Sequence, residues 1–188
     1  MRFTALLDAN ILYPAPLRDL FMRLAVSDIF AARWTERIHD EWMRNVLKNR
    51  QDLAREQLER TRNLMNSHVR DCLVEDFEQL EAGLQLPDED DRHVLAAAIK
   101  CNAQVIVTFN LKDFPEGELN KWGIEAISPD DFVRFQLDLN PGLVCHVVKQ
   151  HREALKNPPK TIAEYLDTLE ANGLVITAAE LRGFAENL

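Results

Sequence analysis

The sequence predicts an α/β fold with a mostly parallel central sheet. Three short, mostly apolar runs, at residues 3–7, 105–107 and 124–127, are separated by segments whose apolar residues recur at helical spacing. Short apolar runs without a charged alternate face are typical of buried parallel strands. Strands that alternate with helices along a chain indicate an α/β domain with a parallel sheet.

The helical segments of this domain are expected between the strands. Residues 17–25 and 36–65 have helical spacing, and the alanine-rich segment 91–101 leads into the strand at 105–107. The stretch SPDDF at 128–132 predicts the start of another helix. Ser128 would be its N-cap, Pro129 its first residue, and Asp131 would close a capping box.

The chain changes character after the Asn-Pro-Gly sequence at 140–142. Three further helices are expected, at 143–155, 161–171 and 177–187. Thr161 with Glu164, and Thr177 with Glu180, have the spacing of capping boxes. We therefore predict an α/β domain over residues 1–140 and a small helical appendage over residues 141–188.

Composition excludes several classes of protein. The chain has 188 residues, of which 46% are hydrophobic, enough for a substantial core. Its start lacks the apolar region of a signal peptide, and no segment approaches about 18 uninterrupted apolar residues, so no membrane association is expected and the cytoplasm is the predicted location. The three cysteines have no C-x-x-C spacing, which argues against a disulfide framework and a zinc site.

Charge is sorted along the chain, although the net charge is −9. Residues 33–70 hold nine basic residues against six acidic ones, a local charge of +3, whereas residues 71–91 hold nine acids and no base. This pattern predicts a basic face beside an acidic pocket. We expect phosphate contacts among the residues Arg44, Lys48, Arg55 and Arg62. The alternative is a solvated helix face with intrahelical ion pairs, such as Glu56 with Arg60.

Four consecutive acids, Asp88 to Asp91, precede the apolar helix at 91–101. One or two acids would suffice to stabilise a helix N-terminus. Further polar residues follow the predicted strands, where parallel sheets bind ligands: Asp8 follows the first strand, and Asn110 and Asp113 follow the second. Glu41 lies two turns into a helix that Thr35 would cap.

Convergence of Asp8, Glu41, Asp91 and Asp113 would require a compensating charge. Two carboxylates about 4 Å apart repel each other by roughly 4 kcal/mol at an effective dielectric constant of about 20. Several such pairs would rival the stability of an ordinary domain, about 5–15 kcal/mol. Either some carboxylates are protonated, or a cation is bound. Ligands that are all oxygen favour Mg²⁺ or Mn²⁺, which can polarise a phosphoryl oxygen and activate water.

Four stretches together resemble a known family. They are LLDANILYPAPLRDLFMRLA, the DE of HDEW, DEDDRHVLAAAIKCNAQVIVTFNLKDFP and GIEAISPDDF. Over about residues 3–135 the chain looks like a PIN domain of the VapC-like toxin branch. The resemblance implies a three-layer α/β/α fold and an endoribonuclease that depends on Mg²⁺ or Mn²⁺. In toxin members it also implies an antitoxin protein as partner. An inactive PIN-like module that only binds protein or RNA is the alternative.

The resemblance also implies roles for individual residues. Asp8, Glu41 and Asp91 match the metal-binding acids, with Asp88 and Asp90 as rivals to Asp91. The family often has an aspartate where this chain has Asn110, so either Asn110 or Asp113 would serve as the fourth group. Small polar positions that orient the acids or the water are matched by Asn10 and Thr108.

Four further expectations complete the interpretation. Metal-activated water would leave 5′-phosphate and 3′-hydroxyl ends on the RNA. His93, the one histidine near the predicted site, is expected to have a packing or surface role, and Trp34, Trp42 and Trp122 are expected in the core or at an interface. The helical appendage resembles the C-terminal extensions of some larger VapC-type toxins; it would contact an antitoxin or a second copy of the chain, or simply complete the core.

Overall fold

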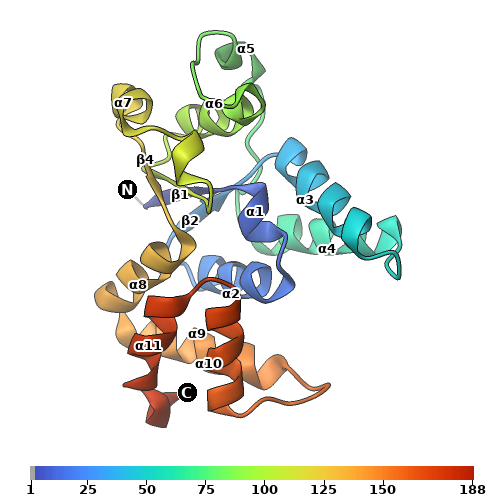
Figure 1. Cartoon of the computed structure of the whole chain (residues 1–188), viewed down its shortest axis with the longest axis vertical. Coiled ribbons are helices and arrows are strands. Elements are labelled where there is room, and N and C mark those ends of the chain that lie inside the picture. Colours follow the sequence, from blue (N-terminus) through green and yellow to red (C-terminus); the bar gives the residue numbers. More distant parts are fainter. Residues whose placement is uncertain (1–2) are drawn as a thin grey trace. The chain divides into compact units, whose positions relative to one another are not determined.

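A four-stranded parallel sheet forms the centre of the α/β part in the computed structural model, which describes residues 3–188 (Figure 1). The strands are β1 (Thr4–Leu7), β2 (Ala31–Arg33), β3 (Val105–Val107) and β4 (Glu125–Ile127), in the order β2-β1-β3-β4. All neighbouring pairs are parallel. The predicted fold class is therefore confirmed. β2 had not been predicted, because a three-residue edge strand of sequence AAR carries no β-branched signal.

The helices of this part are mostly short. They are α1 (Ala9–Leu12), α3 (Glu36–Asn49), α4 (Arg55–His68), α5 (Glu78–Glu81), α6 (Arg92–Lys100) and α7 (Glu116–Leu119). This part also contains the 3-10 turns η1 (Glu89–Asp91), η2 (Leu111–Asp113) and η3 (Asn120–Trp122). α6 packs on β1 and β3. The prediction of one helical run over 36–65 is wrong, because a turn that Arg50 and Asp52 close through paired hydrogen bonds of 2.8 and 2.7 Å separates α3 from α4.

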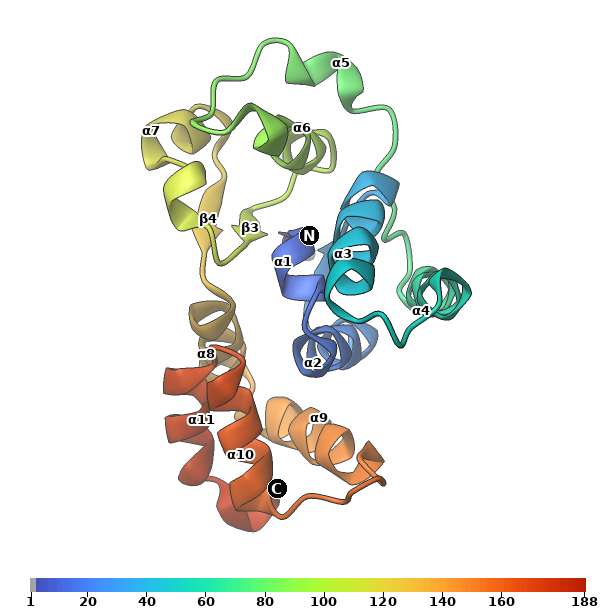
Figure 2. The ribbon, with the colours of Figure 1, turned by 45° about the vertical axis from the view of Figure 1, so that its right-hand side comes forward.

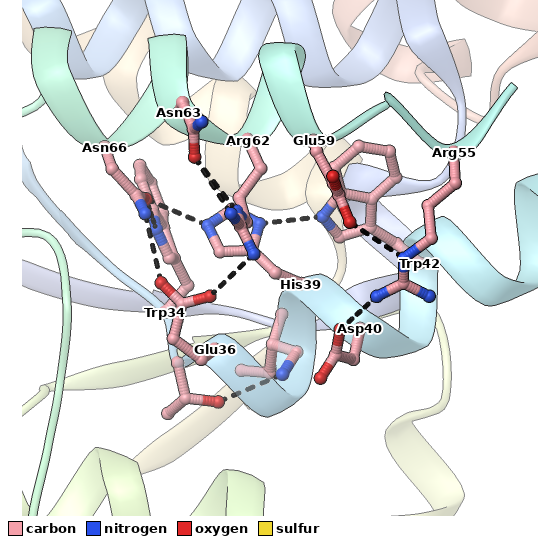
Figure 3. A network of polar contacts seen from close by, with 12 residues as sticks. Trp34, Glu36, His39, Asp40, Trp42, Arg55, Glu59, Arg62, Asn63 and Asn66 are labelled. Carbon is pink, nitrogen blue, oxygen red and sulfur yellow. Dashed lines mark hydrogen bonds and ion pairs between the residues drawn. The ribbon is translucent and has the colours of Figure 1, made fainter. Parts of the chain in front are cut away.

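A chain of partly buried hydrogen bonds links α4 to α3, and the two helices lie side by side in both views (Figures 1 and 2). Figure 3 shows the network: the indole N–H of Trp34 donates to Asn66 Oδ1 at 2.8 Å, and that of Trp42 donates to His39 Nδ1 at 2.9 Å. His39 Nε2 therefore carries the hydrogen that faces Asn66 Oδ1, at 2.9 Å. Trp34 and Trp42 are core residues, as predicted, whereas Trp122 is 48% exposed.

The remaining helices form a second compact unit. It consists of residues 14–29 and 128–188 and contains α2 (Ala15–Val26), α8 (Pro129–Leu139), α9 (Pro141–Ala154), α10 (Ile162–Ala171), α11 (Val175–Arg182) and the 3-10 turn η4 (Ala185–Asn187). The predicted division at residue 140 differs from this one. Apolar and polar contacts bring α2 and α8 into the unit: Phe21 stacks on Phe132, with ring centroids 5.6 Å apart, and Asp19 Oδ2 lies 3.3 Å from His151 Nε2.

Helix starts in this unit test the predicted caps. Ser128 accepts a hydrogen bond from the Asp131 N–H at 3.0 Å, and Thr161 and Glu164 form the expected capping box. The box predicted for Thr177 is wrong, because α11 begins two residues earlier. The carboxylate of Asp130 on α8 instead accepts the N–H groups of Ile176 and Thr177, both at 2.8 Å.

Two expectations from composition can be compared with residues 3–188. Their cysteines, Cys72, Cys101 and Cys145, are all free thiols. None of the helices in this range combines the length and the apolar character that crossing a bilayer requires.

Candidate active site

The parallel sheet places Asp8 and Thr108 at the same edge. β1 ends at Leu7 and β3 at Val107, and these two residues are register partners on adjacent strands. The Asp8 N–H continues the ladder by donating to the Val107 carbonyl at 3.1 Å. The next side chains along the two strands therefore meet, and the Thr108 hydroxyl donates to Asp8 Oδ2 at 2.7 Å.

The Asp8 carboxylate is buried and fixed by three donors. Oδ1 accepts from the Ala9 N–H at 2.6 Å, and Oδ2 accepts from Asn10 Nδ2 and the Thr108 hydroxyl, both at 2.7 Å. Asp8 is only 5% exposed. Burial raises the pKa of Asp8, while its hydrogen bonds with Thr108 and Ala9 lower it. The carboxylate thus has one well-defined orientation at the carboxyl edge of the sheet.

Asn10 and Thr108 also hold the segment that follows β3. Asn10 Nδ2 donates to the Thr108 hydroxyl oxygen at 3.0 Å, and Asn10 Oδ1 accepts from the Phe109 N–H at 3.2 Å. The Asn110 N–H donates to the same hydroxyl oxygen at 3.0 Å. Asn110 itself is exposed, and Asp113 lies half-buried in the turn η2. The two candidates for the fourth group are therefore on one short, well-anchored loop.

Asp91 lies at the start of α6, half-buried, whereas Asp88 and Asp90 are exposed. Burial, together with the negative charges of Asp8, Asp88 and Asp113, raises the pKa of Asp91 to about 6. Three of the four predicted acids therefore share one electrostatic environment.

Glu41 on α3 is the fourth acid, and its closest partner is a buried histidine. Glu41 Oε1 lies 2.9 Å from Nε2 of His93 and 3.8 Å from Nε of Arg37. The charge of Glu41 also contributes to the raised pKa of Asp8. His93 is 1% exposed, and its Nδ1 has no hydrogen-bond partner within residues 3–188. Sequence reasoning gave His93 a packing role; its contact with Glu41 spans 52 positions, so no local spacing announces it.

The donor set suits a hard divalent cation, although the acids do not form a finished ligand shell. No group of three or more histidine, cysteine, aspartate or glutamate side chains in residues 3–188 is arranged to hold a metal ion. The carboxylates of Asp8, Asp91 and Asp113 nevertheless have no lysine or arginine ion pair among the described residues. Clustered oxygen donors with uncompensated negative charge fit Mg²⁺ or Mn²⁺ by chemistry.

The four predicted RNA-binding residues fall into two groups. Arg55 pairs with Glu59 at 2.8 Å and with Asp40 at 3.5 Å (Figure 3). Arg62 lies 3.6 Å from Glu36 and also donates to Asn63. These two arginines therefore resemble the solvated helix face of the alternative interpretation.

Arg44 and Lys48 form the second group. Both are exposed on α3, and neither has an ion pair in the part of the chain that the structure describes. Their charges are one turn apart on the same helix and remain available to a ligand.

Comparison with known family models assigns the chain to a family. The family model of the PIN domain matches residues 4–112, more than half of the sequence. The chain belongs to the PIN-domain family. A second family model, the VapC50 C-terminal domain, matches residues 129–183, almost the same segment as the C-terminal part of the second compact unit.

One curated relative of this PIN-domain protein comes from Mycobacterium tuberculosis (strain ATCC 25618 / H37Rv) and is named "Putative ribonuclease VapC50". It is 47% identical over 79 residues, which are 42% of this chain and 47% of the relative. The match therefore spans about half the length of that relative. No solved structure gave a significant match.

Proposed function

We propose that this PIN-domain protein is a divalent-metal-dependent endoribonuclease and the toxin of a type II toxin–antitoxin pair. The observation that carries the proposal is the environment of Asp91, whose pKa burial raises to about 6 together with the charges of Asp8, Asp88 and Asp113. The carboxylates of Asp8, Asp91 and Asp113 have no lysine or arginine ion pair among the described residues, and such a cluster favours a bound cation. The ribonuclease name of the relative supports the same activity.

Each acid has a role in the proposed site. Asp8, Glu41 and Asp91, with Asp113, would hold Mg²⁺ or Mn²⁺. When bound, the ion would polarise a phosphoryl oxygen and lower the pKa of a water molecule. The expected products carry 5′-phosphate and 3′-hydroxyl ends.

The surrounding residues position these acids. Asn10 and Thr108 each donate to Asp8 Oδ2 at 2.7 Å, which fixes the face of the carboxylate that remains available. His93 does the same for Glu41 through the 2.9 Å contact with its Oε1. Asn110 offers an exposed amide oxygen that can accept a hydrogen bond from a reacting water.

Binding partners follow from the charges. RNA would approach along the positive side chains of Arg44 and Lys48, which have no ion pair within residues 3–188. An acidic centre repels phosphates, so a positively charged surface is needed to attract the RNA. The second compact unit, residues 14–29 and 128–188, is the proposed contact for an antitoxin protein or a second copy of the chain. The cytoplasm is the proposed location.

The deciding experiment is cleavage of total RNA by the purified chain with Mg²⁺ or Mn²⁺, followed by mapping of the fragment ends. We expect 5′-phosphate and 3′-hydroxyl ends, no cleavage in EDTA, and a rise in melting temperature with Mn²⁺. Cyclic phosphate ends, or full activity in EDTA, would overturn the mechanism. An inactive interaction module would show neither cleavage nor stabilisation by Mn²⁺.

A further inference from the structure

An exposed aromatic residue, Phe109, lies at the carboxyl edge of the sheet, the edge that carries Asp8. Phe109 directly follows Thr108, whose hydroxyl donates to the buried Asp8 at 2.7 Å. Its ring is 42% exposed and makes no ring contact within residues 3–188. Single exposed apolar side chains are common on protein surfaces, so the exposure of Phe109 alone assigns no role. What distinguishes Phe109 is its position at the carboxyl edge of the sheet, directly after the residue that holds Asp8.

The backbone that carries this ring is held on both sides. The Phe109 N–H donates to Asn10 Oδ1 at 3.2 Å, and the Asn110 N–H donates to the Thr108 hydroxyl oxygen at 3.0 Å. The Asp113 N–H donates to the Asn110 carbonyl at 3.0 Å, which closes the following turn. Asn10 also holds Asp8, so the same side chain fixes both the acid and the backbone of Phe109.

A neutral aromatic ring can bind RNA at a position where negative charge repels phosphates. The carboxylates of Asp8, Asp91 and Asp113 have no lysine or arginine ion pair among the described residues, and their negative charge repels the phosphates of an approaching RNA strand. A stack between a base and an aromatic ring adds affinity that does not depend on phosphate charge. Every nucleobase has a face that can stack, and an unpaired base can turn away from its strand to do so.

We propose that Phe109 is a nucleobase-binding subsite, which stacks on an unpaired base of the RNA next to the cleaved phosphodiester. The proposal rests on the proposed function and adds the ligand that this position takes. It also gives the enzyme a preference for single-stranded or unpaired RNA, because bases inside a duplex do not offer their faces.

The chain contains a matched control in Trp122. This side chain is 48% exposed, in the same compact unit, and precedes β4. β3 and β4 are parallel, with Val105 opposite Glu125, so Trp122 lies beyond the amino ends of the strands and Phe109 beyond their carboxyl ends. Phe109→Ala and Trp122→Ala each remove an exposed aromatic ring, but only Phe109 lies at the edge that carries Asp8.

The test measures binding of a labelled single-stranded RNA at several salt concentrations. The whole chain is used with the substitution Asp8→Asn, so that the RNA is bound without being cleaved. Phe109→Ala should raise Kd by about 10-fold, the scale of one lost stack. The slope of log K against log salt concentration should be the same for Phe109→Ala and its parent, because no phosphate contact is lost. Phe109→Trp should restore tight binding. Trp122→Ala should leave Kd unchanged, and a fully paired duplex should not distinguish Phe109→Ala from its parent.

Each other outcome has a definite meaning. If Phe109→Ala binds single-stranded RNA like its parent while the wild-type chain cleaves RNA, the subsite is wrong and the proposed function stands. If Phe109→Ala instead changes the oligomeric state in gel filtration without changing Kd, the ring contacts protein, and the proposal is overturned. If the chain with its native Asp8 neither binds nor cleaves RNA, the proposed function and the subsite fail together.

Discussion

Nε2 of His93 lies 2.9 Å from Oε1 of Glu41, and this contact joins α6 to α3. His93 is two residues after Asp91, so the start of α6 has one proposed metal-binding acid at its N-cap and, through His93, contacts another. The buried Nδ1 of His93 has no partner among the described residues, which leaves Nε2 as the nitrogen that carries the hydrogen toward the carboxylate. The placement of Glu41 therefore depends on a residue far from it in the sequence.

Replacing His93 should weaken catalysis through Glu41. His93→Leu removes the donor, and loss of a partner that orients a metal-binding side chain typically costs about 10-fold to 100-fold in activity or metal affinity. His93→Gln keeps an amide N–H that can reach Glu41, so it should recover much of the loss. We would measure cleavage rates and the Mn²⁺ concentration that half-saturates the rise in melting temperature.

Thermal stability without metal provides the control for this pair. Both variants lose some packing at a buried position, so both can be less stable than the wild type. If His93→Gln is as inactive and as poor in Mn²⁺ binding as His93→Leu, His93 has only the packing role that the sequence suggested.

Asp8→Asn should abolish cleavage and also lower the stability of the metal-free chain. The carboxylate accepts from Ala9, Asn10 and Thr108, and an asparagine would turn its NH₂ group toward at least one of these donors. A buried donor or acceptor without a partner costs about 1–3 kcal/mol, which relief of carboxylate repulsion would partly offset. Urea unfolding in EDTA checks the sign.

Asp90→Asn is the matched control, since Asp90 is exposed and its side chain has no hydrogen bond or ion pair in the described part of the chain. It should leave both stability and cleavage near those of the wild type. An Asp8→Asn protein at least as stable as the wild type would mean that repulsion between the acids outweighs the lost hydrogen bond.

Asp91 should make the metal-free chain relatively more stable as pH falls. Its pKa is about 6 in the folded chain, against an ordinary value of 3.8. Above about pH 6 the carboxylate is charged in both states, and the folded state bears the full cost of burying it. Between about pH 6 and pH 4 the folded chain binds a proton that the unfolded chain does not, so this cost disappears.

The measurement compares the free energy of unfolding of the wild type and Asp91→Asn in EDTA from pH 7.5 to pH 4.5. Acids that do not interact with Asp91 affect both proteins alike, so the difference between them reports Asp91 and its coupling to Asp8, Asp88 and Asp113. Asp91→Asn should be the more stable protein at about pH 7, and its advantage should shrink as the pH falls. A difference that is constant with pH would show that Asp91 titrates normally in the folded chain.

Much of the site could be predicted because parallel strands share an edge. Apolar runs located β1 and β3, and the residues after them had to meet at the carboxyl end of the sheet, as Asp8 and Thr108 do. The position of Asp91 followed from the helix that it starts. The sequence located these features because local patterns and sheet geometry determine them.

Features that depend on contacts distant in sequence could not be predicted in this way. The link between His93 and Glu41 and the capping of α11 by Asp130 both join residues that no spacing relates. For the same reason α2 was assigned to the α/β domain, although Phe21 stacks on Phe132 within the second unit. A truncation after residue 141 would leave α2 and α8 without α9, on which both helices pack, so it should destabilise the chain.

Arg44 and Lys48 should dominate the salt dependence of RNA binding. Both are exposed and unpaired within residues 3–188, whereas Arg55 and Arg62 already pair with acids on the α3–α4 face. Each lost phosphate contact lowers the slope of log K against log salt. The double variant Arg44→Gln, Lys48→Gln should therefore bind RNA more weakly and with a shallower slope.

The double variant Arg55→Gln, Arg62→Gln is the matched control, because it removes the same charge from the neighbouring helix. It should change the slope less, because Arg55 and Arg62 would have to break an ion pair within the protein before they could bind a phosphate. Equal slopes for the two double variants would assign RNA binding to overall charge and would leave no specific role for Arg44 and Lys48.

Asp130 should be essential for the start of α11. Its carboxylate is 9% exposed and accepts the N–H groups of Ile176 and Thr177, while the N-cap residue Leu174 offers no side-chain acceptor. Asp130→Ala leaves two N–H groups without a partner and should cost about 1–3 kcal/mol. Asp130→Asn keeps one acceptor, so its stability should lie between those of the wild type and Asp130→Ala.

In Asp130→Ala, hydrogen exchange should become faster at the amides of α11 and stay unchanged at those of β3, because the acids and the sheet belong to the other unit. Asp138→Ala, at an exposed position on the same helix, should have neither effect. Unchanged exchange in α11 for Asp130→Ala would mean that packing against α8 and α10 alone holds the helix start.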